Sequence, residues 1–234
     1  MREIVLDTET TGLEALGGDR VVEIGCVELI NHIPTGQTYH VYINPERTMP
    51  RGAFDVHGLS DDFLRDKPKF RDIGRDFAKF IEGGRLVIHN ASFDVGFLNA
   101  EFARLNIPPI SPDVVVDTLQ LARRRHPAGP NSLDALCSRY GIDNSKRTRH
   151  GALLDAELLA EVYIELIGGK QAALSLMDNG GGSRNGRATT MTPKAQIRQR
   201  PRPLPPRFHE DERAAHDALI AKMGESAIWR KYDA

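Results

Sequence analysis

The sequence predicts an α/β fold in which a mixed central sheet carries helices on both faces. Two features of the hydrophobic pattern point to it. Strand-like segments near the N-terminus follow one another through a turn-rich connection, as antiparallel strands do. From about residue 70 onwards, short apolar runs alternate with segments of helical periodicity, as parallel strands joined by helices do. Both patterns in one chain indicate a mixed sheet.

The first three predicted elements are strands. Residues 3–7 form a short buried strand that ends in an acid, and residues 21–30 form a longer one. A third strand is predicted over residues 38–43. Residues 31–36 include Pro34 and Gly36, which are typical turn residues, so the whole segment is predicted to be the connection.

Helices and strands alternate in the following segment. Apolar residues recur at helical spacing over 70–81 and predict a helix there. Asp117 ends a later strand. An acid at this position either caps the next helix or holds the residues of a nearby site in place without being a ligand itself. Ser132 can begin a helix and Gly141 can end it. The remaining elements are a strand at 86–88, a helix at 93–105, a strand at 114–116, a helix through Tyr140 and a helix over 151–167.

The chain is predicted to have three regions. Residues 1–177 form the folded domain, and residues 178–206 are rich in Gly, Arg and Pro, which is typical of a flexible linker. Residues 207–234 regain helix-forming residues and predict a short C-terminal helical segment. Seven basic residues and no acid lie between positions 184 and 207, although the formal net charge of the chain is −1. The folded domain is therefore acidic.

Composition excludes several classes of protein. Hydrophobic residues make up 40% and charged residues 27%, as in globular proteins, and no apolar run approaches the roughly 20 residues of a membrane span. The N-terminus enters a strand pattern directly, which is unlike a signal peptide. Cys26 and Cys137 lie far apart in apolar surroundings, and we expect reduced core cysteines in a cytoplasmic protein.

Two carboxylates two residues apart predict a cation site. Asp7 ends the first predicted strand and Glu9 follows two residues later; side chains two apart on a strand point to the same face. Two anions so close repel each other unless a cation lies between them, and hard oxygen ligands suit Mg²⁺ or Mn²⁺. The alternative is a polar strand end that turns into solvent.

Two further acids and a histidine have similar settings. Asp94 follows a buried strand within the first turn of a predicted helix, where an acid can also serve only the helix dipole. Asp155 lies in an otherwise apolar helix and needs a partner. His150 would point away from Asp155 if both were helical, so we expect it in the preceding loop, able to swing over the site.

Together these residues resemble the three motifs of the DnaQ-like exonuclease family. Its DEDDh branch has D-x-E, then an Asp after a strand-to-helix turn, then H-x₄-D. All five positions match in order: Asp7, Glu9, Asp94, His150 and Asp155. The segments 7–12, 87–91, 131–137 and 143–148 are also similar to the family's proofreading members, and the resemblance covers about residues 2–170.

This resemblance implies a ribonuclease-H-like fold with a mixed five-stranded sheet, and a 3′→5′ exonuclease acting on single-stranded 3′ ends of DNA. It implies hydrolysis with two metal ions. Asp7, Glu9 and Asp155 would hold one ion, Asp7 would help to hold the second, Asp94 would orient a water on the metal, and His150 would be the general base. An imidazole suits that role, because its ordinary pKa is about 6.5.

The same resemblance implies contacts to substrate and to partner proteins. Asp7, Glu9, Thr10, His57 and Asp155 would contact the substrate, although His57 is equally a candidate for capping its own loop, and a glutamate of the family is replaced by Gly52. His89 and Asn90 would brace the site. Gln171, Leu174 and Leu176 resemble a peptide that docks on the bacterial sliding clamp, and residues 207–234 resemble the segment that binds the catalytic subunit of a replicative polymerase.

Two other functions remain open at this point. An RNA-trimming exonuclease of the same superfamily would share the five residues. A non-catalytic subunit that stabilises a polymerase would need none of them.

Overall fold

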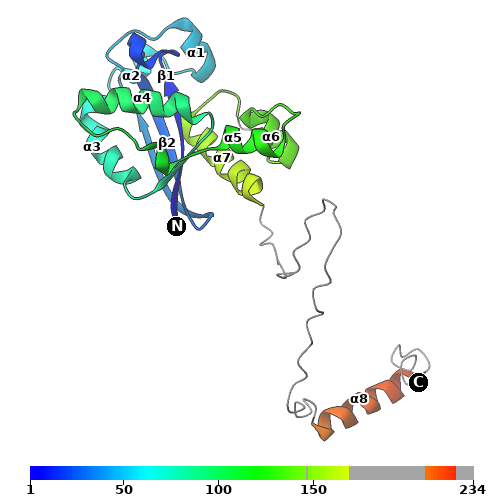
Figure 1. Cartoon of the computed structure of the whole chain (residues 1–234). Coiled ribbons are helices and arrows are strands. Elements are labelled where there is room, and N and C mark those ends of the chain that lie inside the picture. The colour runs from blue at the N-terminus through cyan, green and yellow to red at the C-terminus, as the bar shows by residue number, and fades with distance from the viewer. Residues whose placement is uncertain (146, 169–208, 225–234) are drawn as a thin grey trace, which may run out of the picture. The chain divides into compact units, whose positions relative to one another are not determined.

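The computed structural model describes residues 1–145, 147–168 and 209–224 of the 234-residue chain (Figure 1). The chain divides into two units, residues 1–178 and 179–234. The first unit carries all of the described strands and seven of the α-helices that the structure describes.

The first unit is built on a mixed five-stranded sheet in the order β3-β2-β1-β4-β5. Strands β1, β2 and β3 pair antiparallel, whereas β4 pairs parallel to β1 and β5 parallel to β4. This confirms the predicted ribonuclease-H-like sheet. The bounds are β1 Arg2–Thr10, β2 Val21–Ile30, β3 Ile33–Tyr42, β4 Arg85–Ile88 and β5 Val115–Asp117.

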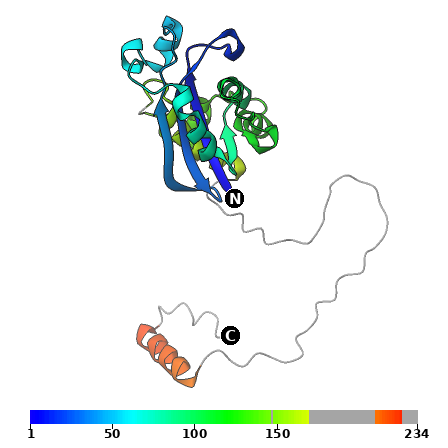
Figure 2. The same ribbon diagram turned by 90° about the vertical axis from the view of Figure 1, so that its left-hand side faces the viewer.

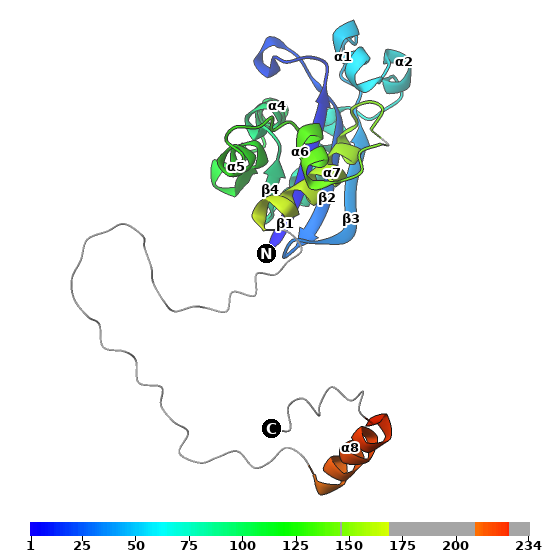
Figure 3. The same cartoon turned by 90° about the vertical axis from the view of Figure 1, so that its right-hand side faces the viewer.

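Helices cover both faces of the sheet, as predicted. Their bounds are α1 Arg51–His57, α2 Asp61–Leu64, α3 Phe70–Ile81, α4 Ala91–Arg104, α5 Thr118–Arg125, α6 Leu133–Tyr140 and α7 Ala152–Ile167. Figure 2 shows the face covered by α4, and Figure 3 shows the opposite face, covered by α6 and α7.

The alternation of side chains along β1 divides the core into two clusters. Ile4 and Leu6 pack in a cluster with residues of α3 and α4, whereas Val5 packs in a second cluster with residues of α5, α6 and α7. A strand buried on both faces has to be apolar at every position, which explains the continuous apolar run in the sequence. Cys26 lies in the first cluster and Cys137 in the second, and both are buried.

Local signals set several helix ends as predicted. The Ser132 side chain accepts a hydrogen bond from the N–H of Ala135, and α6 ends at Gly141 with a left-handed φ of 68°. Asp117 caps α5, accepting from the N–H groups of Leu119 and Gln120. Helices α1, α2 and α5 were not predicted, because four to eight residues are too few for periodicity to show.

The predicted connection over residues 31–36 is wrong in length. The turn consists of Asn31 and His32 alone, with φ values of 51° and 66°, and β3 begins at Ile33. Two residues with positive φ make the tight hairpin turn that matches the twist of antiparallel strands. Pro34 is tolerated within β3 because this strand lies at the edge of the sheet.

Of the second unit, the structure describes residues 209–224, which include α8, Glu210–Met223. Its capping box joins the His209 N–H to the Glu212 carboxylate, and none of its residues is buried. The proposed clamp peptide with Gln171, Leu174 and Leu176, and the linker at 178–206, lie outside the described residues. Within the described part of the chain, no helix has the length and apolar character needed to cross a membrane.

Candidate active site

The acids of strand β1 and the threonine between them point to opposite faces of the sheet. Asp7 and Glu9 share the face of Val5, the face that α7 covers, and Thr8 points to the face of α4. Strand β4 ends at Ile88, opposite Leu6, so β1 has no parallel neighbour beyond Leu6 on that side. The backbone of the acidic segment is therefore available to other partners.

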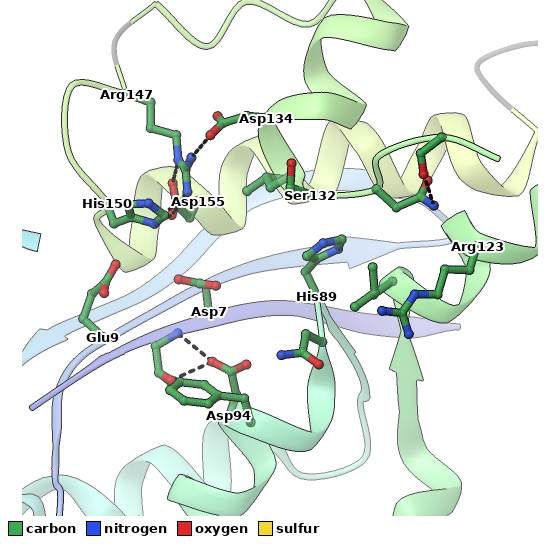
Figure 4. A pocket seen from close by; sticks show the side chains of 17 residues that line it. Asp7, Glu9, His89, Asp94, Arg123, Ser132, Asp134, Arg147, His150 and Asp155 are labelled. Atoms are coloured by element: carbon green, nitrogen blue, oxygen red, sulfur yellow. Dashed lines mark hydrogen bonds and ion pairs between the residues drawn. The ribbon is translucent and has the colours of Figure 1, made fainter. Parts of the chain in front are cut away.

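Asp94 binds to the edge of β1 that β4 leaves unpaired. Its Oδ1 accepts hydrogen bonds from the Thr8 N–H at 3.1 Å and the Thr8 Oγ1 at 2.6 Å. Asn90 adopts a left-handed φ of 61° between β4 and α4, and this sharp turn puts Asp94 in the first turn of α4. Asp94 is thereby fixed to β1 at Thr8 and lies beside Asp7 (Figure 4).

Gly25 lets α7 bring Asp155 to the same place. It pairs with Asp7 across β1 and β2. A Cβ atom at Gly25 would lie 2.2 Å from the carbonyl carbon of Ala152 and from the nitrogen of Leu153. The backbone of the first turn of α7 therefore rests directly on β2, and Asp155, one turn further, reaches the face that carries Asp7 and Glu9 (Figure 4).

Arg147 binds the Asp155 carboxylate with two hydrogen bonds. Its Nε lies 2.6 Å from Oδ1 and its Nη2 lies 2.7 Å from Oδ2. Nη1 donates to Asp134 at 2.6 Å, and Nη2 also lies 2.8 Å from the Nδ1 of His150. The side chain of Arg147 is only 8% exposed, so these contacts fill the place beside Asp155 (Figure 4).

His150 lies in the loop before α7, where the sequence predicted it. Its Nδ1 is 3.3 Å from the Asp155 Oδ2, and about half of the side chain is exposed. Its backbone N–H donates to the Val56 carbonyl at 3.3 Å, and the neighbouring Arg149 lies over the ring of Phe54. The loop is thus held by α1 on one side and by Arg147 on the other, with the imidazole at the surface between them.

His57 and Thr10 lie next to this loop. The Nδ1 of His57 accepts a hydrogen bond from the Leu59 N–H at 3.0 Å, which is the loop-capping role that the sequence left open. Burial lowers the pKa of His57, against the opposing effect of the Thr10 backbone. The Thr10 Oγ1 donates to the Gly12 carbonyl at 2.6 Å. Gly52 faces open space in α1.

The acids line a cleft of about 750 Å³ that continues well beyond them. His89 and Asn90 line it from the β4–α4 connection, Phe93 lines it from α4, and Arg123 lines it from α5. His89 braces its wall, because its Nδ1 is 2.9 Å from the Thr118 Oγ1. The remaining lining residues are Leu119, Gly129, Asn131, Ser132, Leu133 and Asp134.

Burial and mutual repulsion disfavour the charged forms of the crowded carboxylates. Burial, followed by repulsion from Asp94, raises the pKa of Asp7 well above its ordinary value. Burial, followed by repulsion from Asp155 and Glu23, raises the pKa of Glu9 to about 8. Burial also raises the pKa of Asp94 to about 7, although the bonds from Thr8 oppose it.

This donor set fits a hard divalent cation. Possible ligand atoms of Glu9, His150 and Asp155 lie within 4.8 Å of one another, and Asp7 lines the same cleft. Carboxylate oxygens are the ligands that Mg²⁺ and Mn²⁺ prefer. A cation would also remove the repulsion that raises the pKa of Asp7 and Glu9.

Without divalent metal, the Tm is expected to fall as the pH rises from about 5 to about 8. Glu9 and Asp94 have pKa values of about 8 and about 7 in the folded protein, against ordinary values of 4.5 and 3.8. A carboxyl with a raised folded pKa stabilises the protein fully below its unfolded pKa, and this contribution is lost as the pH rises through the folded pKa. The loss is about 1.4 kcal/mol for each unit of difference.

Differential scanning calorimetry in EDTA measures this dependence. Glu9→Gln should reduce the slope, and Mn²⁺ should flatten it. A Tm in EDTA that is level across this interval would contradict the repulsion described above.

The sequence alone did not single out four residues that shape the site. Glu23 pairs with Glu9 across β1 and β2 and adds to its raised pKa. Asp134 and Arg147 lay within recognisable motifs but had no assigned contact. Gly25 lies within an apolar strand, where a glycine signals only that another backbone comes close.

Comparison with known proteins places the chain in a family. The family model described as "Exonuclease" (RNase_T) matches residues 4–163. The chain is 48% identical to DNA polymerase III subunit epsilon of Salmonella typhimurium and 45% identical to that of Escherichia coli, each over 98% of this chain and 97% of the relative. Identity to the Haemophilus influenzae subunit is 54% over 72% of this chain and 68% of the relative.

Solved structures agree with these relatives. Exonuclease X in complex with 5′ overhanging duplex DNA has a TM-score of 0.55 and 26% identity, over 70% of this chain and 90% of that chain. The nuclease domain of 3′hExo, a DEDDh family member bound to rAMP, has a TM-score of 0.60 at 16% identity, over 71% of this chain and 91% of that chain, and shares the fold. The chain therefore belongs to this exonuclease family and, within it, to the epsilon subunits of DNA polymerase III.

Proposed function

We propose that this chain is the 3′→5′ exonuclease of a replicative DNA polymerase III and removes mispaired nucleotides from the 3′ ends of DNA. One observation carries the proposal. Three separate elements and a loop bring Asp7, Glu9, Asp94, Asp155 and His150 into one cleft. A subunit that only stabilised a polymerase would have no use for so costly a cluster of anions.

In the proposed reaction Asp7, Glu9 and Asp155 would hold two Mg²⁺ or Mn²⁺ ions. When bound, such ions would polarise the scissile phosphate, lower the pKa of water and neutralise the departing 3′ oxygen. Asp94, tied to β1 through Thr8, keeps one carboxylate oxygen for orienting the attacking water. His150 is exposed enough to take the proton of that water and pass it to solvent.

Selectivity for mispairs follows from the need for a single strand. A mispaired end unpairs more readily than a paired one, so it enters a narrow cleft more often. Thr10 and His57 are the proposed contacts of the terminal nucleoside, since they lie beside Glu9 and the His150 loop.

The test is release of deoxynucleoside monophosphates from single-stranded, paired and mispaired 3′ ends in Mg²⁺. We expect the single strand and the mispaired primer to be degraded faster than the paired one. An RNA strand of the same sequence degraded as fast as DNA would favour an RNA-trimming enzyme. No release from any strand, together with no uptake of Mn²⁺ in calorimetry, would favour a non-catalytic stabilising subunit.

The C-terminal region is proposed to connect this domain to the replication machinery in the cytoplasm. Residues 207–234 would bind the alpha (catalytic) subunit of DNA polymerase III, and Gln171, Leu174 and Leu176 would dock on the sliding clamp. The unburied surface of α8 supports the first contact. A flexible linker over 178–206 would hold the nuclease at roughly millimolar effective concentration near the primer end.

Co-purification with the alpha subunit tests this connection. The full chain is expected to bind, and a chain that ends at residue 206 is expected not to. Equal retention of both would move the contact to the exonuclease domain.

A further inference from the structure

Two arginines line the catalytic cleft, and they differ in their surroundings. Arg147 is engaged by Asp134 and Asp155. Arg123 is exposed, and among the described residues no carboxylate lies within ion-pair distance of it and its guanidinium makes no hydrogen bond. Of the two lining arginines, Arg123 is therefore the one whose guanidinium can pair with an anionic ligand.

Arg123 lies at the far end of the cleft from the proposed catalytic histidine. Figure 4 shows Glu9 and His150 together at one end, Asp7 and then His89 further along, and Arg123 beyond His89. The cleft thus runs from an acidic centre to a basic end.

The orientation of Arg123 is set by the packing of α5. Leu119 and Arg123 are four residues apart and line the cleft from the same face of the helix. Asp117 caps the N-terminus of α5, and the Thr118 Oγ1 donates to the Ile88 carbonyl at 3.3 Å, which fixes α5 against β4. The next two arginines do not line the cleft: Arg124 is exposed, and Arg125 donates to the carbonyls of Glu165 and Leu166.

The segment that leads into α6 also lines the cleft and is held by local hydrogen bonds. The Asn131 side-chain nitrogen donates to the carbonyls of His126 and Gly129, and Ser132 caps α6. This loop contributes Gly129, Asn131 and Ser132 to the lining of the same cleft.

We propose that Arg123 binds a backbone phosphate of the substrate strand on the 5′ side of the scissile bond. The proposal rests on the proposed function: with the terminal nucleoside near His57 and the scissile phosphate at the carboxylates, the rest of the strand leaves towards Arg123. Five lining carboxylates repel a polyanion, and bound cations offset this only at the centre. A guanidinium at the exit supplies attraction where the strand has passed that centre.

Substrate length separates this role from a catalytic one. The p-nitrophenyl ester of thymidine 5′-phosphate and the dinucleotide of thymidine contain the scissile phosphodiester alone. Longer oligothymidylates add phosphates on the 5′ side. For full-length Arg123→Gln in Mg²⁺, we expect kcat/KM to fall about tenfold on an octanucleotide, mainly through KM, and by less than about twofold on the ester. Arg123→Lys should recover part of the loss.

Arg124→Gln is the matched control, since it removes the same charge one position along α5 but outside the cleft. The slope of log kcat/KM against log salt should also decrease by about 0.7 for Arg123→Gln alone. Anisotropy of a fluorescent octanucleotide with a phosphorothioate-blocked 3′ end gives the same comparison without cleavage.

Two results would overturn the proposal. Equal behaviour of Arg123→Gln and Arg124→Gln at every length would show that Arg123 serves only the end of α5. An equal loss on the ester and the octanucleotide would place Arg123 at the reacting phosphate. Failure of the proposed function looks different, because the wild-type chain would then release nothing from any substrate.

Discussion

Replacing Asp7 with asparagine is expected to reduce the exonuclease rate on single-stranded DNA by about a thousandfold or more, because metal-ion stabilisation of the transition state is worth several kcal/mol. Asp7 lies between Glu9 and Asp94 along the cleft and is the proposed ligand of both ions. The asparagine has nearly the same shape but no charge. Single-turnover release of the terminal nucleotide measures the effect directly.

The same substitution should make the metal-free protein more stable. Burial and repulsion by Asp94, Glu9 and Asp155 raise the pKa of Asp7, so its ionised form destabilises the fold at neutral pH. In EDTA at pH 8, Asp7→Asn is therefore expected to have a higher Tm than the wild type. If the variant lost activity and also had a lower Tm than the wild type, Asp7 would stabilise the fold, and the claim that its ionised form destabilises it would be wrong.

Replacing Gly25 with alanine is expected to lower the exonuclease rate by about a hundredfold, although Gly25 contacts no substrate. The new Cβ would lie 2.2 Å from backbone atoms of Ala152 and Leu153, and backbone cannot rotate away as a flexible side chain can. Helix α7 would have to shift, which would move Asp155 away from Asp7 and Glu9. Overpacking of this kind also costs about 1–3 kcal/mol of stability.

Gly96→Ala is the control for this experiment. Gly96 lies in α4, and a Cβ there would meet nothing within 4 Å. Alanine is the better helix former by about 1 kcal/mol, so this variant should be slightly more stable and fully active. Mn²⁺ affinity should fall in Gly25→Ala and stay unchanged in Gly96→Ala. An unchanged affinity in both variants would show that metal binding does not depend on the position of α7.

The parts of the site that the sequence predicted depend on local geometry. Asp7 and Glu9 share a face because a strand alternates, and Asp94 follows a strand-to-helix turn whatever surrounds it. The helix at 70–81 was predicted with its final bounds for the same reason: twelve residues are enough for a period of 3.6 to show.

The parts that were missed depend on contacts between distant segments. Glu23 matters because β2 pairs it with Glu9, and Asp134 because a loop returns Arg147 to it. The turn at Asn31 was misjudged because Pro34 looks like a turn residue, and its tolerance in β3 depends on which strand ends up at the edge. For His57 the sequence left two roles open, substrate contact and loop capping. The hydrogen bond that the Leu59 N–H donates to Nδ1 is the loop-capping contact.

Arg147 gives the resting site a positive charge of its own. A divalent ion that takes Asp155 as a ligand has to share it with this guanidinium or displace it, so the affinity found in a titration is a difference between two occupants. While Arg147 donates to the Nδ1 of His150, a neutral ring carries its proton on Nε2 and has no lone pair left for water. One side chain, Arg147, thus occupies both the Asp155 carboxylate and the Nδ1 lone pair of His150.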